Sequence, residues 1–135
     1  LPPLMGEIAA RCIETDVARQ LIEWHRVEAR ARHAIALEIL KGYTFKAAPE
    51  CLHLWLDLPE GHHADDVIRA LRAKGIVMAG PESFITGHAS IPRALRLCLG
   101  SPPTRDQLCD AVEGVREVLS AEPVTALARL DVMVM

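Results

Sequence analysis

Aromatic residues are scarce in this sequence, making up 4% of its 135 positions. The core must therefore be aliphatic, built from Leu, Ile, Val and Ala. No apolar run approaches the roughly 20 residues that a membrane-spanning helix requires. Positive charge is also in short supply, because 15 Lys and Arg residues stand against 18 Asp and Glu residues. Since a phosphate backbone is bound by a basic face, the composition argues against direct contact with nucleic acid.

The sequence also lacks closely spaced cysteines. Cys12, Cys51, Cys98 and Cys109 are widely spread and form no C-x-x-C motif, so neither a zinc site nor a redox motif is indicated. Two disulfides are possible in principle, but no signal-peptide pattern opens the sequence. We therefore expect reduced thiols in a cytoplasmic protein that does not bind membranes.

Two polar clusters raise the question of binding chemistry. The pair His62-His63 invites a metal site, but adjacent residues at a helix start point in different directions. We expect a solvated helix start there and no metal site. The second cluster mixes arginines with glutamates along one predicted helix, which is typical of a solvated, partly paired face rather than a nucleic-acid patch. Its members are Arg19, Arg26, Arg30 and Arg32 with Glu23 and Glu28.

Hydrophobic periodicity predicts an α+β fold, with a small, mostly antiparallel sheet of three to four strands covered by helices. The predicted helices cover residues 4–14, 17–41, 64–74 and 104–119. The predicted strands cover residues 52–58, 76–78 and 95–99, with a further candidate at 83–85. The first helix is expected to turn Ile8, Cys12 and Ile13 inward. In the long second helix the apolar positions Val17, Leu21, Trp24, Ala31, Ile35 and Ile39 recur at helical spacing.

The most informative segment is the strand at 95–99 with the helix start that follows it. Three leucines alternate there with Arg96 and Cys98, so the leucines face a core and the Arg96 guanidinium lies on the other side. A guanidinium in that position can bind a carboxylate through two parallel hydrogen bonds. Thr104 and Gln107 stand in capping-box register at the start of the last helix.

Together with two upstream segments, this one resembles the C-terminal small domain of fold-type I aminotransferases. The three segments are residues 52–61 (LHLWLDLPEG), 74–84 (KGIVMAGPESF) and 95–97 (LRL). The likeness is greatest to MocR-type regulators of the GntR superfamily, in which a winged helix-turn-helix is fused to an aminotransferase-like domain. It covers roughly residues 4–119.

This resemblance implies a ligand site that the chain contains only in part. In that family the arginine corresponding to Arg96 binds the α-carboxylate of a substrate or effector, and Phe84 is a candidate for lining the cleft. Pyridoxal 5'-phosphate is held on a preceding large domain, through a lysine Schiff base, an aspartate and a phosphate-binding loop. Lys41, Lys46 and Lys74 lack such a setting. We therefore expect no cofactor and no catalytic residue in this chain, and a parent that binds pyridoxal phosphate.

Three functions fit these features. The chain is the effector-binding part of an aminotransferase-like transcriptional regulator, the small domain of a working aminotransferase, or an unrelated α+β interaction module. In the first two cases it is a single domain, 1–135, excised from a homodimeric parent, where it contacts its own large domain and an amino-acid or amine ligand. The third is favoured if the strand at 52–58 does not neighbour the Arg96 strand. The segment 124–135 is expected to pack back onto the domain, with self-association or disorder as alternatives.

Overall fold

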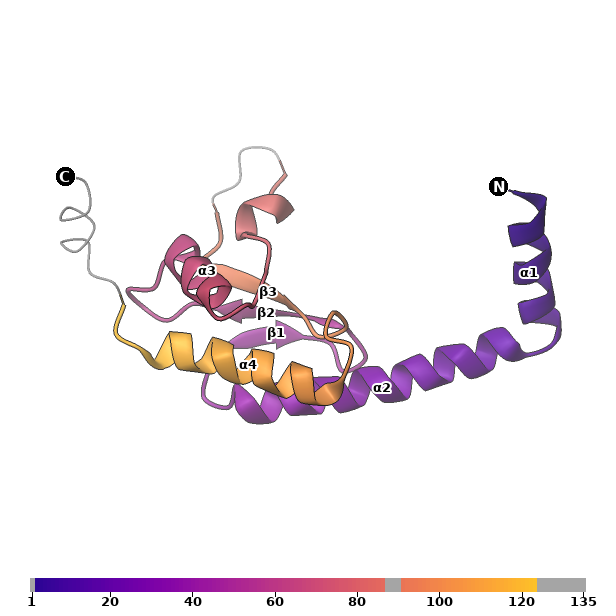
Figure 1. Cartoon of the computed structure of the whole chain (residues 1–135), viewed down its shortest axis with the longest axis horizontal. Helices are drawn as coiled ribbons and strands as arrows, with labels where there is room; N and C mark the ends of the chain where they lie inside the picture. Colours follow the sequence, from indigo (N-terminus) through magenta and orange to yellow (C-terminus); the bar gives the residue numbers. More distant parts are fainter. Residues whose placement is uncertain (1, 87–90, 124–135) are drawn as a thin grey trace.

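The computed structural model describes residues 2–86 and 91–123, which form helices around one small sheet (Figure 1). Two helices come first and are followed by two neighbouring strands. A third strand, much later in the chain, completes the sheet before the last long helix. The elements are α1 (Pro3–Glu14), α2 (Val17–Ile39), β1 (Phe45–Ala47), β2 (His53–Asp57), α3 (Ala64–Ala73), the 3-10 helix η1 (Pro81–Phe84), β3 (Ala94–Cys98) and α4 (Arg105–Ser120).

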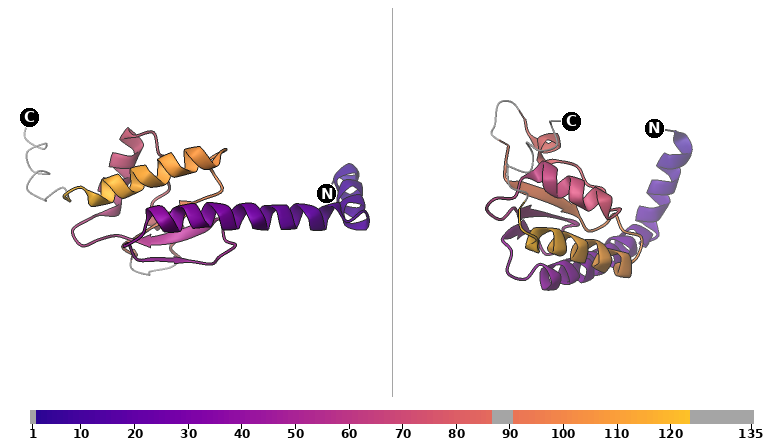
Figure 2. Two further views of the ribbon diagram at one scale, coloured as in Figure 1. Left: turned by 90° about the horizontal axis from the view of Figure 1, so that it is seen from below. Right: turned by 60° about the vertical axis from the view of Figure 1, so that its left-hand side comes forward.

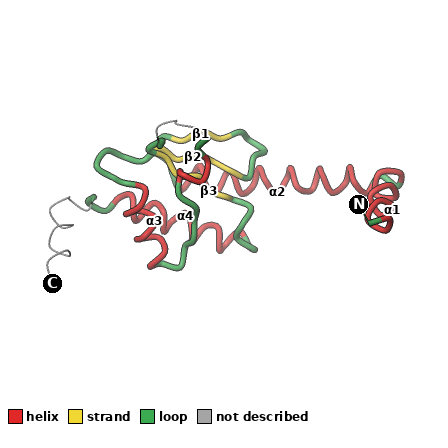
Figure 3. Tube along the Cα trace, turned by 90° about the horizontal axis from the view of Figure 1, so that it is seen from above, coloured by secondary structure: helices red, strands yellow, loops and turns green. Residues whose placement is uncertain are grey.

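The sheet is antiparallel with strand order β1-β2-β3, so the predicted α+β class is confirmed. Because side chains alternate along a strand, the register sorts them into two faces. Leu54 pairs with Leu97 and Leu56 with Leu95, which places these four leucines on one face. That face packs against buried side chains of α2, α3 and α4. Figure 3 shows the strands to one side of these helices.

The core is aliphatic, as the scarcity of aromatic residues predicts. Its fully buried members come from every layer of the fold, since α2, α3, α4 and the two longer strands each contribute. In α4 the four residues expected to face inward, Leu108, Val112, Val115 and Leu119, are all buried. Burying one such side chain contributes about 1.5–3 kcal/mol, so this layer is the main source of stability.

The helix ends follow the sequence signals closely. Thr104 and Gln107 form the predicted capping box. The backbone N–H of Gln107 donates to Thr104 Oγ1, and the backbone N–H of Thr104 donates to Gln107 Oε1. The chain leaves α2 and α3 through Gly42 and Gly75, whose φ angles of 95° and 80° are left-handed. Glycine adopts that conformation without steric cost, which explains both positions.

Three strand assignments differ from the prediction. Residues 76–78 form no strand, and η1 occupies most of the 83–85 candidate. Conversely, β1 is absent from the predicted strands. This strand has only three residues and lies at the edge of the sheet, where two of them remain exposed. A sequence so short carries no alternation, so pairing with β2 rather than local propensity forms the strand.

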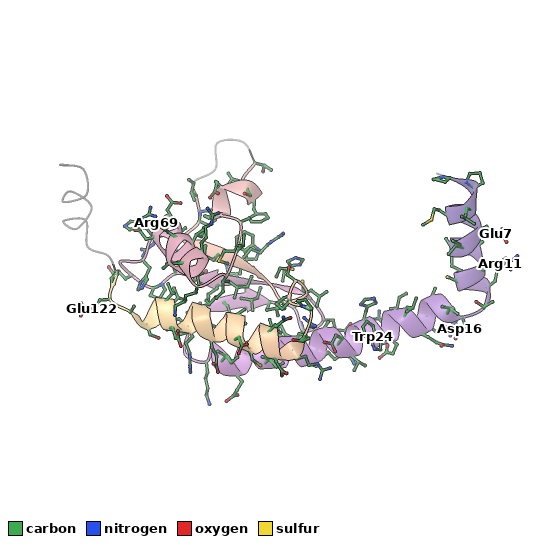
Figure 4. All side chains as sticks on the ribbon, viewed as in Figure 1. Glu7, Arg11, Asp16, Trp24, Arg69 and Glu122 are labelled. Atoms are coloured by element: carbon green, nitrogen blue, oxygen red, sulfur yellow. The ribbon has the colours of Figure 1, made fainter. Side chains whose placement is uncertain are left out.

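The N-terminal part of the chain projects away from the rest, with α1 turned across the end of α2 (Figure 2). The prediction that Ile8 and Ile13 point inward is wrong, because α1 has no buried residue and these side chains are 46% and 72% exposed. The apolar positions in the first half of α2, Val17, Leu21 and Trp24, are exposed as well. Figure 4 shows Trp24 and Asp16 on this projecting part, far from the sheet.

The second half of α2 packs on the core with a face slightly rotated from that of the apolar positions. Its buried positions are Ala29, Arg32, His33 and Ala36, followed by Leu40 after the helix end. Ala31, Ile35 and Ile39 lie at the margin and are partly buried. All buried residues of the long helix therefore lie in this half.

All four cysteines are free thiols, and three of them are partly buried. None of the helices formed by the described residues combines the length and apolar character that a membrane crossing requires. The segment 124–135, and most of the loop at 87–92, lie outside the described residues.

Candidate ligand site

Arg96 lies at the centre of β3, on the sheet face opposite the leucine core. It pairs with Trp55 of β2, which in turn pairs with Lys46 of β1, so the three side chains form one row across the sheet. Its neighbours Leu95 and Leu97 are buried on the other face, whereas Arg96 is partly exposed. The alternation read from the sequence therefore places the guanidinium where predicted.

Phe84 holds the Arg96 guanidinium from one side. The carbon centre of the guanidinium lies 4.1 Å from the centre of the Phe84 ring, a cation–π arrangement. Trp55 meets the same ring edge-on, with ring centres 5.4 Å apart. η1 positions Phe84 for this contact because the turn begins at buried Pro81 and packs against β3. Among the described residues the Arg96 guanidinium donates to no hydrogen-bond partner, so its N–H groups are available to a ligand.

Arg96 has no carboxylate partner among residues 2–86 and 91–123, in contrast to several arginines of α2. It borders a cavity of about 250 Å³ that runs along the outer edge of β3. The cavity walls are largely apolar and are formed by the 76–79 segment, β3, the bend after it and α4. Its lining includes Phe84, Arg96, Leu97, Leu99, Pro102 and Val112. An unpaired cation at an apolar cavity is suited to a small ligand with one carboxylate.

The bend from Leu99 to Thr104 forms one end of this cavity and is held by backbone contacts. The Leu99 amide donates to the Leu52 carbonyl at 2.7 Å, and the Ser101 amide donates to the Cys98 carbonyl at 3.4 Å. The capping box at Thr104 then fixes the start of α4.

Arg32 of α2 contacts the same bend, and the sequence analysis did not predict this contact. It was placed on a solvated face, but its side chain is only 9% exposed. Its guanidinium donates to the carbonyls of Leu99 at 3.0 Å, Pro102 at 2.7 Å and Pro103 at 3.4 Å. The spacing offered a signal, because Arg32 lies three residues after Ala29 and four before Ala36 and so shares their buried face.

Glu28 completes this arrangement. It accepts from Arg32 at 2.7 Å and from the Arg105 guanidinium at 2.6 Å. Hydrogen bonds from Arg105 and then Arg32 lower the pKa of Glu28 from 4.5 to about 2. The same contact raises the pKa of Arg105. Glu28 is therefore a carboxylate throughout the physiological range.

The remaining arginines of α2 behave as predicted, on a solvated and partly paired face. Arg19 pairs with Asp16 at 2.9 Å, and Arg26 lies 3.4 Å from Glu50. Arg30 also pairs with Glu50, and this hydrogen bond lowers the pKa of the Glu50 carboxyl. All three arginine side chains are more than half exposed.

The prediction of a solvated start for α3 is wrong at His62. This side chain is 9% exposed, and within the described part of the chain neither ring nitrogen has a hydrogen-bond partner. The backbone turns just before it, and the Pro59 carbonyl accepts from the His62 amide at 3.2 Å. His63 is exposed. No group of three potential metal ligands occurs among the described residues.

The lysines do not fit a pyridoxal phosphate site within this chain. Lys74 ends α3 and donates to Glu117 at 2.8 Å, which lowers the pKa of that carboxyl. Lys41 is exposed just beyond the end of α2, and Lys46 is exposed on the edge strand β1. A Schiff-base lysine needs a desolvated or electropositive setting beside a phosphate cradle, and none of the three has one.

The chain resembles known proteins in both sequence and fold. No family model matches it. It is 29% identical over 118 residues to an uncharacterized HTH-type transcriptional regulator, YdeF, of Bacillus subtilis (strain 168). The match takes in 87% of this chain and 25% of that regulator, so the chain spans about a quarter of its relative's length.

Two solved aminotransferases share the fold. The kynurenine aminotransferase of Pyrococcus horikoshii superposes with a TM-score of 0.71 and 19% identity, over 84% of this chain and 29% of that one. LysN, the α-aminoadipate aminotransferase of Thermus thermophilus, superposes with a TM-score of 0.67 and 17% identity, over 87% of this chain and 30% of that one. The chain has the fold of the small domain of pyridoxal phosphate-dependent aminotransferases, and in sequence it resembles part of an HTH-type transcriptional regulator.

Proposed function

We propose that this chain is the C-terminal, effector-binding part of an aminotransferase-like transcriptional regulator. In this proposal Arg96 binds the carboxylate of an amino acid, and Phe84 lines the cleft beside it. Pyridoxal phosphate would be bound by a large domain outside this chain, and DNA by a further domain of the parent. The sequence similarity to an HTH-type regulator supports the regulatory role.

The observation that carries the proposal is the Arg96 guanidinium, which has no acidic partner among the described residues and borders an apolar cavity. Phe84 covers one side of the guanidinium, whose N–H groups have no hydrogen-bond partner among the described residues, so an incoming carboxylate can accept two parallel hydrogen bonds. No acidic side chain of the described residues forms an ion pair with Arg96 in competition with a ligand. The apolar walls of the cavity favour a carboxylate with an apolar body over a small hydrophilic anion.

A working aminotransferase is the second candidate, because both solved neighbours are aminotransferases. The two candidates would use Arg96 alike, so residues of this chain separate them poorly. The gene sequence upstream distinguishes them: a winged-helix segment before the cofactor domain supports the regulator, and its absence supports the enzyme. The unrelated interaction module is disfavoured, because β2 and β3 are neighbours in one sheet.

The carboxylate role can be tested on the chain itself by NMR titration. The Arg96 Nε–Hε resonance should shift on addition of 3-phenylpropionate and should not shift with the uncharged 3-phenylpropionamide. Arg96→Lys retains the charge but loses the planar fork, so we expect about tenfold or more weaker carboxylate binding. Arg93→Lys is the matched control, because Arg93 is exposed and donates only to the Pro59 carbonyl in the described structure.

Two results would contradict the carboxylate role. The first is equal loss of carboxylate binding in both variants. The second is an Arg96→Lys protein that no longer melts cooperatively, which would make Arg96 a structural residue. In the intact parent, the same substitution should weaken an amino-acid ligand more than the matching amine that lacks the carboxylate.

A further inference from the structure

Helix α2 reaches the wall of the Arg96 cavity through one side chain. Arg32 donates to the carbonyls of Leu99 and Pro102, and both of these residues line the cavity. A third bond reaches the carbonyl of Pro103. The bend that closes the cavity is thus attached to a helix that lies far earlier in the chain, and the attachment is nearly enclosed.

The bend requires an arginine at this place. Pro102 and Pro103 have no backbone N–H, so the bend has few local donors for its own carbonyls. Arg32 uses Nε toward Glu28, Nη1 toward two carbonyls and Nη2 toward a third. These bonds occupy four of the five N–H groups of a guanidinium. Lysine offers three donors on a single atom and cannot reproduce this spread.

Glu28 extends the attachment to the far side of the bend. Its Oε2 accepts from Arg105 at the first turn of α4, while Oε1 accepts from Arg32. The same carboxylate therefore joins Arg32 of α2 to Arg105 of α4. One turn of α2, from Glu28 to Arg32, sets the position of both the 99–103 backbone and the start of α4.

We propose that Arg32 is a positioning residue for the Arg96 ligand cavity: it holds the 99–103 bend at the distance from β3 and α4 that ligand binding requires. The proposal rests on the proposed carboxylate role of Arg96. It adds that α2, the helix whose first half projects from the domain, is rigidly connected to the ligand site. Displacement of α2 is then transmitted to the cavity wall.

Arg30 supplies a matched comparison on the same helix. It also forms an ion pair with a glutamate, but its side chain is 51% exposed and its partner Glu50 lies before β2. Arg32 follows Arg30 by two positions, which is about 200° around a helix, so the two side chains leave opposite faces. Arg30→Lys thus tests charge and helix propensity without touching the bend.

The experiment compares wild type with Arg32→Lys, Arg30→Lys and Leu119→Ala. Leu119 is buried in α4 outside the cavity lining, so its truncation controls for general loss of stability. The first measurement is amide hydrogen exchange at Leu99 and Ser101, without ligand. The second is the dissociation constant of 3-phenylpropionate from NMR titration. Arg32→Lys should speed exchange at both amides and weaken binding about two- to thirtyfold.

The controls should keep the dissociation constant within about twofold of wild type. Unchanged affinity in Arg32→Lys would overturn the proposal, and so would an equal loss of affinity in Leu119→Ala. If Arg32→Lys does not fold, Glu28→Gln replaces it. That variant keeps the three carbonyl bonds and should show the same effects, but smaller ones.

The two proposals fail in different ways. If wild type does not bind 3-phenylpropionate, the carboxylate role of Arg96 fails. The positioning role of Arg32 is then tested by amide hydrogen exchange alone. Unchanged exchange at Leu99 and Ser101 in Arg32→Lys overturns it. Faster exchange at these two amides, with the rest of the sheet unaffected, upholds it.

Discussion

The two halves of helix α2 have similar residue types but very different surroundings. From Ala29 onward the helix packs against the core and α4, and Ala36 is fully buried. Before Ala29, Leu21 and Trp24 are 51% and 61% exposed, and no residue of α2 is buried. The apolar pattern continues through both halves, so the pattern alone does not tell which half is covered.

The first half of α2 and α1 together expose several large apolar side chains. Exposed apolar side chains are common singly, but a run along α1 and half of α2 is typical of an interaction face. Under the proposed function, the large domain of the parent would cover this run. The hydrogen bonds of Arg32 would then connect that domain, through α2, to the wall of the Arg96 cavity.

The same substitution in the two halves should separate them most clearly. Leu40→Ala at the buried end of α2 should lower the free energy of unfolding by about 2–5 kcal/mol, because it leaves a cavity in the core. Leu21→Ala should change it by less than about 0.5 kcal/mol. Denaturant unfolding of both variants, followed by circular dichroism, measures the difference. A comparable loss in Leu21→Ala would mean that the first half is packed after all.

The core and the site could be predicted where the sequence has strong local periodicity. The alternation around Arg96 assigned both faces of β3, and the offset of Thr104 and Gln107 gave the start of α4. These features depend on neighbouring residues only. They follow from the repeat of two in a strand and from the geometry of a helix end.

Features that depend on distant contacts could not be predicted in this way. β1 exists because it pairs with β2, and Val77 is 78% exposed in a segment whose apolar residues suggested a strand. The burial of Arg32 depends on a bend about 70 residues later. A charged residue on a predicted helix is usually solvated, so only the face that Arg32 shares with Ala29 and Ala36 indicated burial.

Acid should also distinguish the two regions. The folded-state pKa of Glu28 is about 2, below its ordinary 4.5, so its contribution is complete above pH 4.5 and is lost as the pH falls toward 2. Glu28→Gln should therefore flatten the acid side of the stability curve between pH 5 and pH 2. Glu7→Gln removes a pair on α1 with both side chains at least 60% exposed, and should leave that curve unchanged. Thermal melts between pH 5 and pH 2 measure these stability curves. Identical curves for wild type and Glu28→Gln would refute the role of this carboxylate.

The smallest expected effect concerns two threonines at helix ends. Thr104 caps α4, whose inner face lies in the core, so Thr104→Ala should lower the free energy of unfolding by about 1 kcal/mol. Thr15 donates to the Arg11 carbonyl at the end of α1, which buries no residue. Fraying of α1 is therefore not coupled to unfolding of the sheet, and Thr15→Ala should change the free energy of unfolding by less than about 0.5 kcal/mol. Amide exchange in the Thr15→Ala variant should rise within α1 alone. If exchange also rose in α4 or the strands, the two regions would be one cooperative unit, and the division at Ala29 would be wrong.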